Sequence, residues 1–204
     1  MDSTLDLRKL LGLHYYVHDL ERSRRFYTER LGFAEIGKSS AELERAGRQR
    51  SLVFQAGDIV ITCSTPDGQG GRAARYLAKH PDGIGTLAFE VDDVERTFSL
   101  LEARGGTPIS EVQRFEDAHG KLATFSITTP FGDTTFRFIE RHGYRGLFPG
   151  MELYDSPTGG QNPAEFSAID HITTNFQTMA PALLWMEHVM GLVPLWEVEF
   201  HTRD

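Results

Sequence analysis

The chain of 204 residues is poor in cysteine and has no long apolar run. Cys63 is its one thiol, and no stretch reaches the roughly 18 apolar residues of a membrane-spanning helix. A lone thiol cannot form an intrachain disulfide, so nothing in the sequence requires an oxidising compartment. Cys63 lies in a β-branched run and is expected to be a buried strand residue. The charged N-terminal segment lacks the apolar core of a signal peptide, which predicts a soluble cytoplasmic protein without a membrane partner.

An excess of positive charge is also missing. The formal net charge is −8, and the basic residues are scattered among acidic ones. Because a phosphate backbone is bound by a basic face, nucleic acid is not expected as a partner. The sequence also lacks the Gly-Xaa-Ser-Xaa-Gly elbow of serine hydrolases and the His-Glu-Xaa-Xaa-His zinc motif. Its composition, 40% hydrophobic and 25% charged, is that of an ordinary globular protein.

A strand followed by a helix recurs along the chain. In the first copy residues 11–17 are aromatic and β-rich, Asp19 is expected to cap a helix, and Gly32 to end it. The second copy aligns without a gap at an offset of 74 residues, so that Val17 lies on Val91 and Gly32 on Gly106. Further strands are expected at 33–36, 50–55, 58–64, 85–91, 121–128 and 134–139, with a short helix at 72–79. Two such βαβββ units predict one closed domain of the α+β class.

A third copy begins at an offset of 159 residues, with Gly191 on Gly32. It predicts a strand at 167–173, a helix from about 178 to 190, and a further strand at 195–200. The segment 144–163 is rich in Gly, Pro, Ser and Asn and is expected to be a linker. The predicted organisation is therefore an N-terminal domain of two units (1–143), a linker (144–165), and the incomplete start of a second such domain (166–204). A segment of about forty residues buries too little surface to be stable alone. It would have to pack on the first domain, swap with another chain, or belong to a longer protein, and the last alternative is favoured.

The duplicated unit, with its strand, acidic cap, aromatic helix and Leu-Gly-Phe ending, resembles the vicinal oxygen chelate superfamily. That superfamily includes glyoxalases, extradiol dioxygenases and bleomycin-binding proteins. Three stretches are similar, more specifically, to the 4-hydroxyphenylpyruvate dioxygenase family. They are Thr-Pro-Phe-Gly-Asp-Thr-Thr-Phe-Arg-Phe-Ile-Glu-Arg at 129–141, Tyr-Arg-Gly-Leu-Phe-Pro-Gly at 144–150, and Ile-Asp-His-Ile-Thr-Thr-Asn at 169–175 together with 199–204.

The resemblance implies a non-metal N-terminal domain and a C-terminal domain that holds Fe(II) through two histidines and a glutamate. Of these ligands only His171 has a counterpart here, and no further catalytic residue is identified. The second histidine and the glutamate would lie beyond Asp204. The implied reaction converts 4-hydroxyphenylpyruvate, a 2-oxo acid, and dioxygen into homogentisate in tyrosine breakdown. Because side chains alternate along a strand, Thr173 is expected to face the same side as His171 and line the substrate pocket.

From one histidine alone, a strand histidine bonded to a neighbour would be the favoured interpretation of His171. The register of the repeat and the resemblance favour a metal ligand instead. In the first two copies the same position holds Gly12 and Thr86, and Arg137 stands where the family places its glutamate. These residues do not favour a glyoxalase-like metal site in the first domain, where His14 is expected to be a packed or hydrogen-bonded core histidine.

Two further hypotheses stay open. Hydroxymandelate synthase resembles the same family and uses the same substrate, and the residues that separate the two activities would lie past Asp204. Alternatively, the chain is a non-catalytic member of the superfamily that binds a small molecule between its two units, or forms a homo-oligomer through exposed sheet edges.

Overall fold

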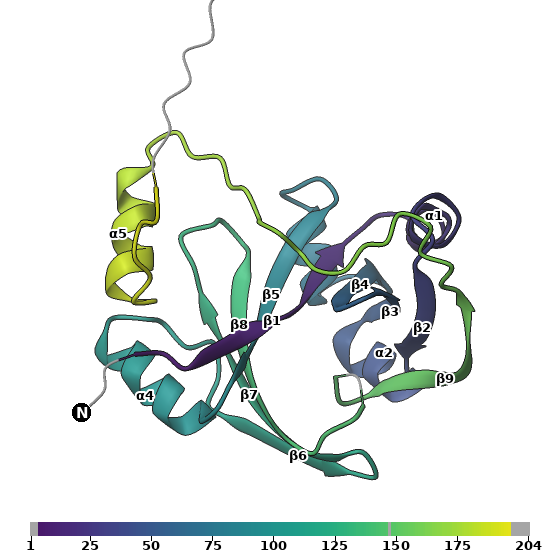
Figure 1. Cartoon of the computed structure of the whole chain (residues 1–204), viewed down its shortest axis with the longest axis horizontal. Coiled ribbons are helices and arrows are strands. Elements are labelled where there is room, and N and C mark those ends of the chain that lie inside the picture. Colours follow the sequence, from purple (N-terminus) through teal and green to yellow (C-terminus); the bar gives the residue numbers. More distant parts are fainter. Residues whose placement is uncertain (1–3, 147, 197–204) are drawn as a thin grey trace, which may run out of the picture.

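The computed structural model describes residues 4–146 and 148–196. Its centre is a curled, nine-stranded mixed sheet in the order β6-β7-β8-β5-β1-β4-β3-β2-β9 (Figure 1). The strands are β1 (Leu7–Tyr16), β2 (Ala34–Ser39), β3 (Gln49–Ala56), β4 (Ile59–Pro66), β5 (Gly83–Val91), β6 (Gln113–Asp117), β7 (Gly120–Thr128), β8 (Thr135–His142) and β9 (Met151–Gly159). The helices are α1 (Leu20–Arg25), continued by a π-helical turn η1 (Phe26–Arg30), then α2 (Ala41–Gly47), α3 (Arg72–Leu77), α4 (Val94–Ala103) and α5 (Ala180–His188).

The duplication expected from the sequence is present in the sheet. β1 and β5 run antiparallel at its centre, and each pairs in parallel with the last strand of its own unit, β4 or β8. Leu13 lies opposite Ile61 in the first unit, and Leu87, 74 residues later (87 − 13), lies opposite Phe136 in the second. The prediction of an α+β fold built from paired βαβββ units is confirmed.

The ends of the first helix in each unit follow the predicted capping pattern. The Asp19 carboxylate accepts the backbone N–H of Arg22 at 2.9 Å, and the Asp93 carboxylate accepts that of Arg96 at the same distance. Each cap satisfies one of the N–H groups that a helix start leaves without a partner. After η1, Gly32 has a φ of 71°, a left-handed conformation that a residue with a Cβ adopts only with strain.

Alternating side chains divide the sheet into a convex face, covered by α1, α4 and α5, and a concave face. On β8, Phe136 and Phe138 point to the convex side, into a core with α4 and α5. Thr135, Arg137 and Ile139 alternate with them and line the concave side. The first unit forms a matching core between its strands and α1, in which Phe54 is fully buried. The helices α1, α4 and α5 therefore cover the convex face, whereas α2 and α3 contribute residues to the wall of the concave face.

Cys63 lies in β4 and is 1% exposed, as expected from the sequence. Burial raises the pKa of its thiol to about 12. The thiol therefore stays protonated at neutral pH and behaves as a small core residue rather than as a nucleophile.

Three elements are absent from the sequence-based prediction: α2, β6 and β9. The segment expected to be an interdomain linker contains β9, which pairs antiparallel with β2 and forms one edge of the sheet. Leu153 of β9 lies opposite Gly37, and Glu152 lies opposite Lys38. The proposed division between two domains stays a prediction, but residues 151–159 of the segment 144–165 belong structurally to the first sheet.

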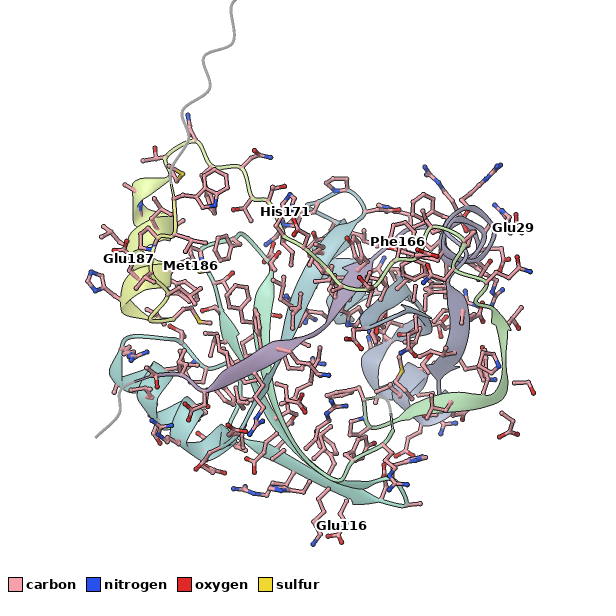
Figure 2. All side chains as sticks on the ribbon, in the orientation of Figure 1. Glu29, Glu116, Phe166, His171, Met186 and Glu187 are labelled. Carbon is pink, nitrogen blue, oxygen red and sulfur yellow. The ribbon has the colours of Figure 1, made fainter. Side chains whose placement is uncertain are left out.

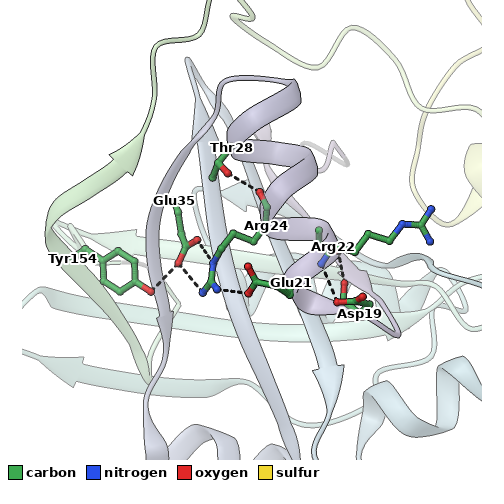
Figure 3. Close-up of polar contacts among 8 residues, drawn as sticks. Asp19, Glu21, Arg22, Arg24, Thr28, Glu35 and Tyr154 are labelled. Carbon is green, nitrogen blue, oxygen red and sulfur yellow. Dashed lines mark hydrogen bonds and ion pairs between the residues drawn. The ribbon is translucent and has the colours of Figure 1, made fainter.

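A buried carboxylate helps to join β9 to the first unit (Figure 3). Glu35 of β2 is 5% exposed and accepts hydrogen bonds from the Arg24 guanidinium at 2.7 Å and from the Tyr154 hydroxyl of β9 at 3.0 Å. Burial, followed by the bond to Glu35, raises the pKa of Tyr154 to about 12. A buried carboxylate is stable only when its oxygens have such donors, so Tyr154 links the edge strand to α1 through Glu35.

Replacement of Tyr154 by Phe is expected to destabilise the protein by about 1–2 kcal/mol, the usual cost of removing a hydrogen bond to a charged group. The ring remains, so the loss reports the hydroxyl alone. Urea unfolding of Y154F checks this. Tyr144→Phe is a matched control, because the Tyr144 hydroxyl also bonds a carboxylate, at 2.9 Å, but that carboxylate belongs to the exposed Asp117. Equal losses in the two variants would contradict a special role for Glu35.

The third copy of the repeat is only partly regular. Its helix is present as α5, two residues shorter at each end than expected, but the strand expected at 167–173 is wrong: these residues join no sheet. The strand expected at 195–200 has irregular backbone at 195–196, and its remaining residues lie outside the described ones. No helix in the described part of the chain is both long and apolar enough to cross a membrane.

Candidate functional site

His171, the expected metal ligand, lies on an extended segment that crosses from the first unit towards α5 (Figures 1 and 2). The segment is held by side-chain packing and a backbone hydrogen bond to a turn, and it does not pair with a neighbouring strand. Ile169 and Ile172 pack against the core of the first unit, and the carbonyl of Ser167 accepts the backbone N–H of Asp58 at 2.8 Å. Those contacts fix the backbone on both sides of His171, whose side chain is 72% exposed.

The neighbouring carboxylate determines which ring nitrogen of His171 is available. His171 Nδ1 lies 2.5 Å from a carboxylate oxygen of Asp170. An ionised carboxylate only accepts hydrogen bonds, so Nδ1 carries the proton, and in the neutral ring Nε2 keeps its lone pair. A histidine that donates one N–H to a carboxylate and coordinates a metal through the other nitrogen is a common arrangement in metal sites.

The described residues nevertheless provide one ligand rather than three. Among residues 4–146 and 148–196 no three His, Cys, Asp or Glu side chains gather in a way that could hold a metal ion. Thr173 is exposed, as is His171, but without a strand the expected shared strand face does not exist. The facial triad that Fe(II) oxygenases need is therefore not assembled by the described chain, and Thr173 as a pocket residue stays a prediction.

A separate cavity of about 790 Å³ occupies the concave face of the sheet. Its wall includes the positions that correspond to His171 in the first two copies: Gly12 on β1 and Thr86 on β5. A Cβ on Gly12 would come within 2.7 Å of the carbonyl oxygen of Val60, and Thr86 bonds the Thr135 hydroxyl at 2.9 Å. In this wall Gly12 therefore permits close packing of the strands, and Thr86 takes part in a hydrogen bond between hydroxyls.

Arg137 projects into the same cavity from β8. Its Nε lies 3.4 Å from the Ser126 hydroxyl, and its guanidinium carbon lies 4.5 Å from the centre of the Phe148 ring. Burial lowers the pKa of Arg137, because the apolar surroundings disfavour its charged form. No carboxylate pairs with Arg137 among the residues that the structure describes, although buried cations are normally paired. Arg72 of α3 also lines the cavity, with its guanidinium 6.0 Å from the Tyr16 ring centre.

His14 lies beside these two cations. Its Nε2 is 2.6 Å from the Ser64 hydroxyl, which confirms the prediction of a hydrogen-bonded core histidine. Burial, followed by repulsion from Arg137 and Arg72, lowers the pKa of His14 to about 3. The ring is partly open to the cavity, where water would lessen the cost of burial, but the repulsion acts in the same direction. His14 is therefore neutral at physiological pH.

Sequence reasoning placed Arg137 in the register of the family glutamate and left open a small-molecule site between the two units, but it did not predict the positive charge of the cavity. Arg72 and Arg137 come from different units, and only the curl of the sheet brings them to one cavity. The available signal was the replacement of an expected carboxylate by a cation within an otherwise β-rich strand.

Comparison with known proteins agrees with the architecture. Residues 9–134 match the model of the Glyoxalase/Bleomycin resistance protein/Dioxygenase superfamily, and the chain belongs to this family. It resembles the N-terminal portion of 4-hydroxyphenylpyruvate dioxygenases. The enzyme of Yarrowia lipolytica is 32% identical over 199 residues, and that of Dictyostelium discoideum is 28% identical over 196. Each alignment covers 92% of this chain but only 50% and 53% of the relative, so the chain spans about half the length of these curated relatives.

Solved structures show the same fold. A mutant of 4-hydroxymandelate synthase from Streptomyces coelicolor superimposes with a TM-score of 0.75 at 20% identity, over 96% of this chain and 55% of that one. Methylmalonyl-CoA epimerase from Mycobacterium tuberculosis superimposes with a TM-score of 0.57 at 19% identity, over 70% of this chain and 93% of that one. At these identities the likeness establishes the fold.

Proposed function

We propose that this chain is the N-terminal half of an Fe(II)-dependent 4-hydroxyphenylpyruvate dioxygenase-type enzyme of the cytoplasm. The enzyme would convert 4-hydroxyphenylpyruvate into homogentisate in tyrosine breakdown. The observation that carries the proposal is the similarity to curated dioxygenases across 92% of the chain. In this proposal the first two units form a non-metal domain, and His171 is the first of three iron ligands.

The local chemistry of His171 supports its role as a ligand. Asp170 fixes the proton on Nδ1, so that Nε2 is left to coordinate, and the packed Ile169 and Ile172 hold the backbone on either side. The second histidine and the glutamate would come from the C-terminal half, and Thr173 would border the 2-oxo acid. When bound, iron supplies the transfer of electrons to dioxygen that accompanies decarboxylation of the keto acid and hydroxylation of its ring.

Exposed apolar side chains at the C-terminal end also support a larger assembly. Leu183 and Leu184 of α5 are 45% and 53% exposed, and Val193 and Trp196 are 82% and 74% exposed. Large exposed apolar side chains are costly in water and, when they gather, commonly mark an interface. In the proposed enzyme this surface packs against the strands of the catalytic half.

The test compares this chain with the same chain extended by its catalytic half. The extended protein is expected to bind one Fe(II) by anaerobic titration and to consume dioxygen with 4-hydroxyphenylpyruvate, giving homogentisate. The 204-residue chain is the matched control: it contains His171 but not the other ligands, so it is expected to show no stoichiometric iron binding and no turnover. An extended protein that binds no iron would refute the proposal and favour the non-catalytic binding module.

Hydroxymandelate synthesis is the second candidate, favoured by the structural likeness over 96% of the chain. Both reactions would use the same iron ligands and the same keto acid, so product analysis distinguishes them. Chromatography of the reaction mixture would show 4-hydroxymandelate in place of homogentisate.

A further inference from the structure

We propose that the cavity on the concave face of the first two units is a binding site for a small organic carboxylate with an apolar body. The proposed ligand contacts Arg137 and lies between the two units, away from the iron site proposed above. This inference does not depend on the dioxygenase activity, because every residue that carries it belongs to the described sheet and its connections.

The charge of the cavity points to an anion. The protein as a whole carries a net charge of −8, yet the side chains that line the cavity include one carboxylate, Asp58, and a larger cationic set. The cationic residues are Lys9, Arg72, Arg75, Arg137 and Arg141. Arg141 is paired with Glu90 at 3.0 Å. Arg137 has no carboxylate partner among the described residues, so an anion entering the cavity would supply the missing counter-charge.

The shape of the polar groups points to a carboxylate. The planar guanidinium of Arg137 presents parallel donors that match the two oxygens of a carboxylate. Hydroxyl donors lie around it: Ser126 on β7, and Thr86 and Thr135 on β5 and β8. The neutral His14 can neither repel a cation nor attract an anion strongly, so the arginines determine the preferred charge.

The rest of the wall points to an apolar body. Leu11, Leu13, Val53 and Ile139 line the cavity, and the Phe148 ring lies against the Arg137 guanidinium. A volume of about 790 Å³ is within the range of sites that enclose small organic ligands. A bare inorganic anion would leave these apolar walls in contact with water, whereas an aryl or alkyl carboxylate would cover them.

A buried hydrogen-bond acceptor without a donor also agrees with an occupied cavity. The Gln49 side-chain oxygen is buried and accepts no hydrogen bond from the described residues, while its amide nitrogen donates to the Ser64 hydroxyl at 3.3 Å. Gln49 lines the same cavity, and buried acceptors are normally satisfied. A hydroxyl on the ligand body or an ordered water is the donor that this oxygen requires.

The first experiment uses the complete 204-residue chain and two probes that share one carbon skeleton: phenylpropionate, with a carboxylate, and phenylpropanol, without one. Calorimetric titration is expected to show saturable one-to-one binding of phenylpropionate, with phenylpropanol at least about tenfold weaker because it cannot pair with Arg137. The His14 ring proton signals are expected to shift on addition of phenylpropionate. Acetate and inorganic phosphate, which lack the apolar body, are expected to bind at least about tenfold more weakly than phenylpropionate.

The second experiment tests the residue. Arg137→Met keeps most of the side-chain volume, removes the charge, and is expected to weaken phenylpropionate at least about tenfold without lowering Tm. Arg114→Met is the matched control, because Arg114 is exposed and paired with Glu95 outside the cavity. Should R137M fail to fold, R137K and the comparison of charged with neutral probe in the wild type still decide the question. The proposal would be overturned by equal binding of the two probes, by unchanged phenylpropionate binding in R137M or R137K, or by the absence of saturable phenylpropionate binding. Phosphate binding as strong as that of phenylpropionate would replace the proposal by a general anion site.

Discussion

Substitution of His171 by Ala is expected to abolish iron binding in the chain extended by its catalytic half, and to reduce turnover of 4-hydroxyphenylpyruvate to below about one thousandth of wild type, roughly 4 kcal/mol in barrier height. The physical reason is that a facial triad leaves no redundant ligand: two remaining protein ligands cannot hold the metal and its open positions in place. Anaerobic Fe(II) titration, followed by oxygen-electrode assays, measures both losses.

The protein contains a closely matched control for this substitution. His18 is also exposed, and its Nδ1 also lies near a carboxylate, that of Asp82 at 2.6 Å. His18→Ala is therefore expected to leave iron binding and turnover unchanged. Asp170→Asn tests the neighbour: a weaker hydrogen bond to Nδ1 is expected to lower iron affinity by about 10- to 100-fold, as for other residues that orient a ligand. Full activity of H171A would refute the assignment of His171 as a ligand.

A strand could be predicted from the sequence when its own residues favour it, and not when it depends on partners distant in the sequence. The central strands β1, β4, β5 and β8 carry β-branched and aromatic residues, so their sequences favour strands before any partner is known. The edge strands β6 and β9 do not. β6 is charged at most positions, and β9 contains Pro157, features that protect sheet edges from pairing with other chains. Their strand conformation depends on partners distant in the sequence, which periodicity does not reveal.

The contrast between local sequence features and long-range contacts also explains which parts of the candidate sites could be predicted. The prediction of His171 as a metal ligand rests on the register of the repeat and on the resemblance of residues 169–175 to the dioxygenase family, and both can be read directly from the sequence. The strand expected around it did not form in the described chain, because a strand needs a hydrogen-bonding neighbour and these residues instead pack their isoleucines on the first unit. The cavity charge could not be predicted, because Arg72 and Arg137 become neighbours only when the two units close on each other.

The neutral state of His14 should make the protein less stable in mild acid. Burial and the charges of Arg137 and Arg72 lower the pKa of His14 to about 3 from the ordinary 6.5. In the unfolded chain His14 binds a proton as the pH falls through 6.5, whereas the folded protein does not. Since the unfolded state then binds more protons, the free energy of unfolding falls with decreasing pH, by at most about 1.4 kcal/mol per pH unit. The contribution is fully present above the unfolded pKa and is lost progressively towards the folded pKa.

Urea unfolding of wild type and His14→Gln at neutral pH and at about pH 4.5 would measure this effect, because glutamine can still bond Ser64 but does not titrate in this range. The wild type is expected to lose about 1–3 kcal/mol more than H14Q over that interval, the lower value applying if water in the cavity reduces the cost of burial. Parallel losses would mean that His14 titrates normally in the folded protein. NMR titration of its ring protons provides an independent measure, since His14 is expected to keep the chemical shifts of a neutral imidazole down to about pH 4.5. The phenylpropionate complex adds a further constraint. A carboxylate bound to Arg137 would offset part of the repulsion that keeps His14 neutral, so the ligand is expected to raise the pKa of His14 and to reduce the acid-induced loss of stability.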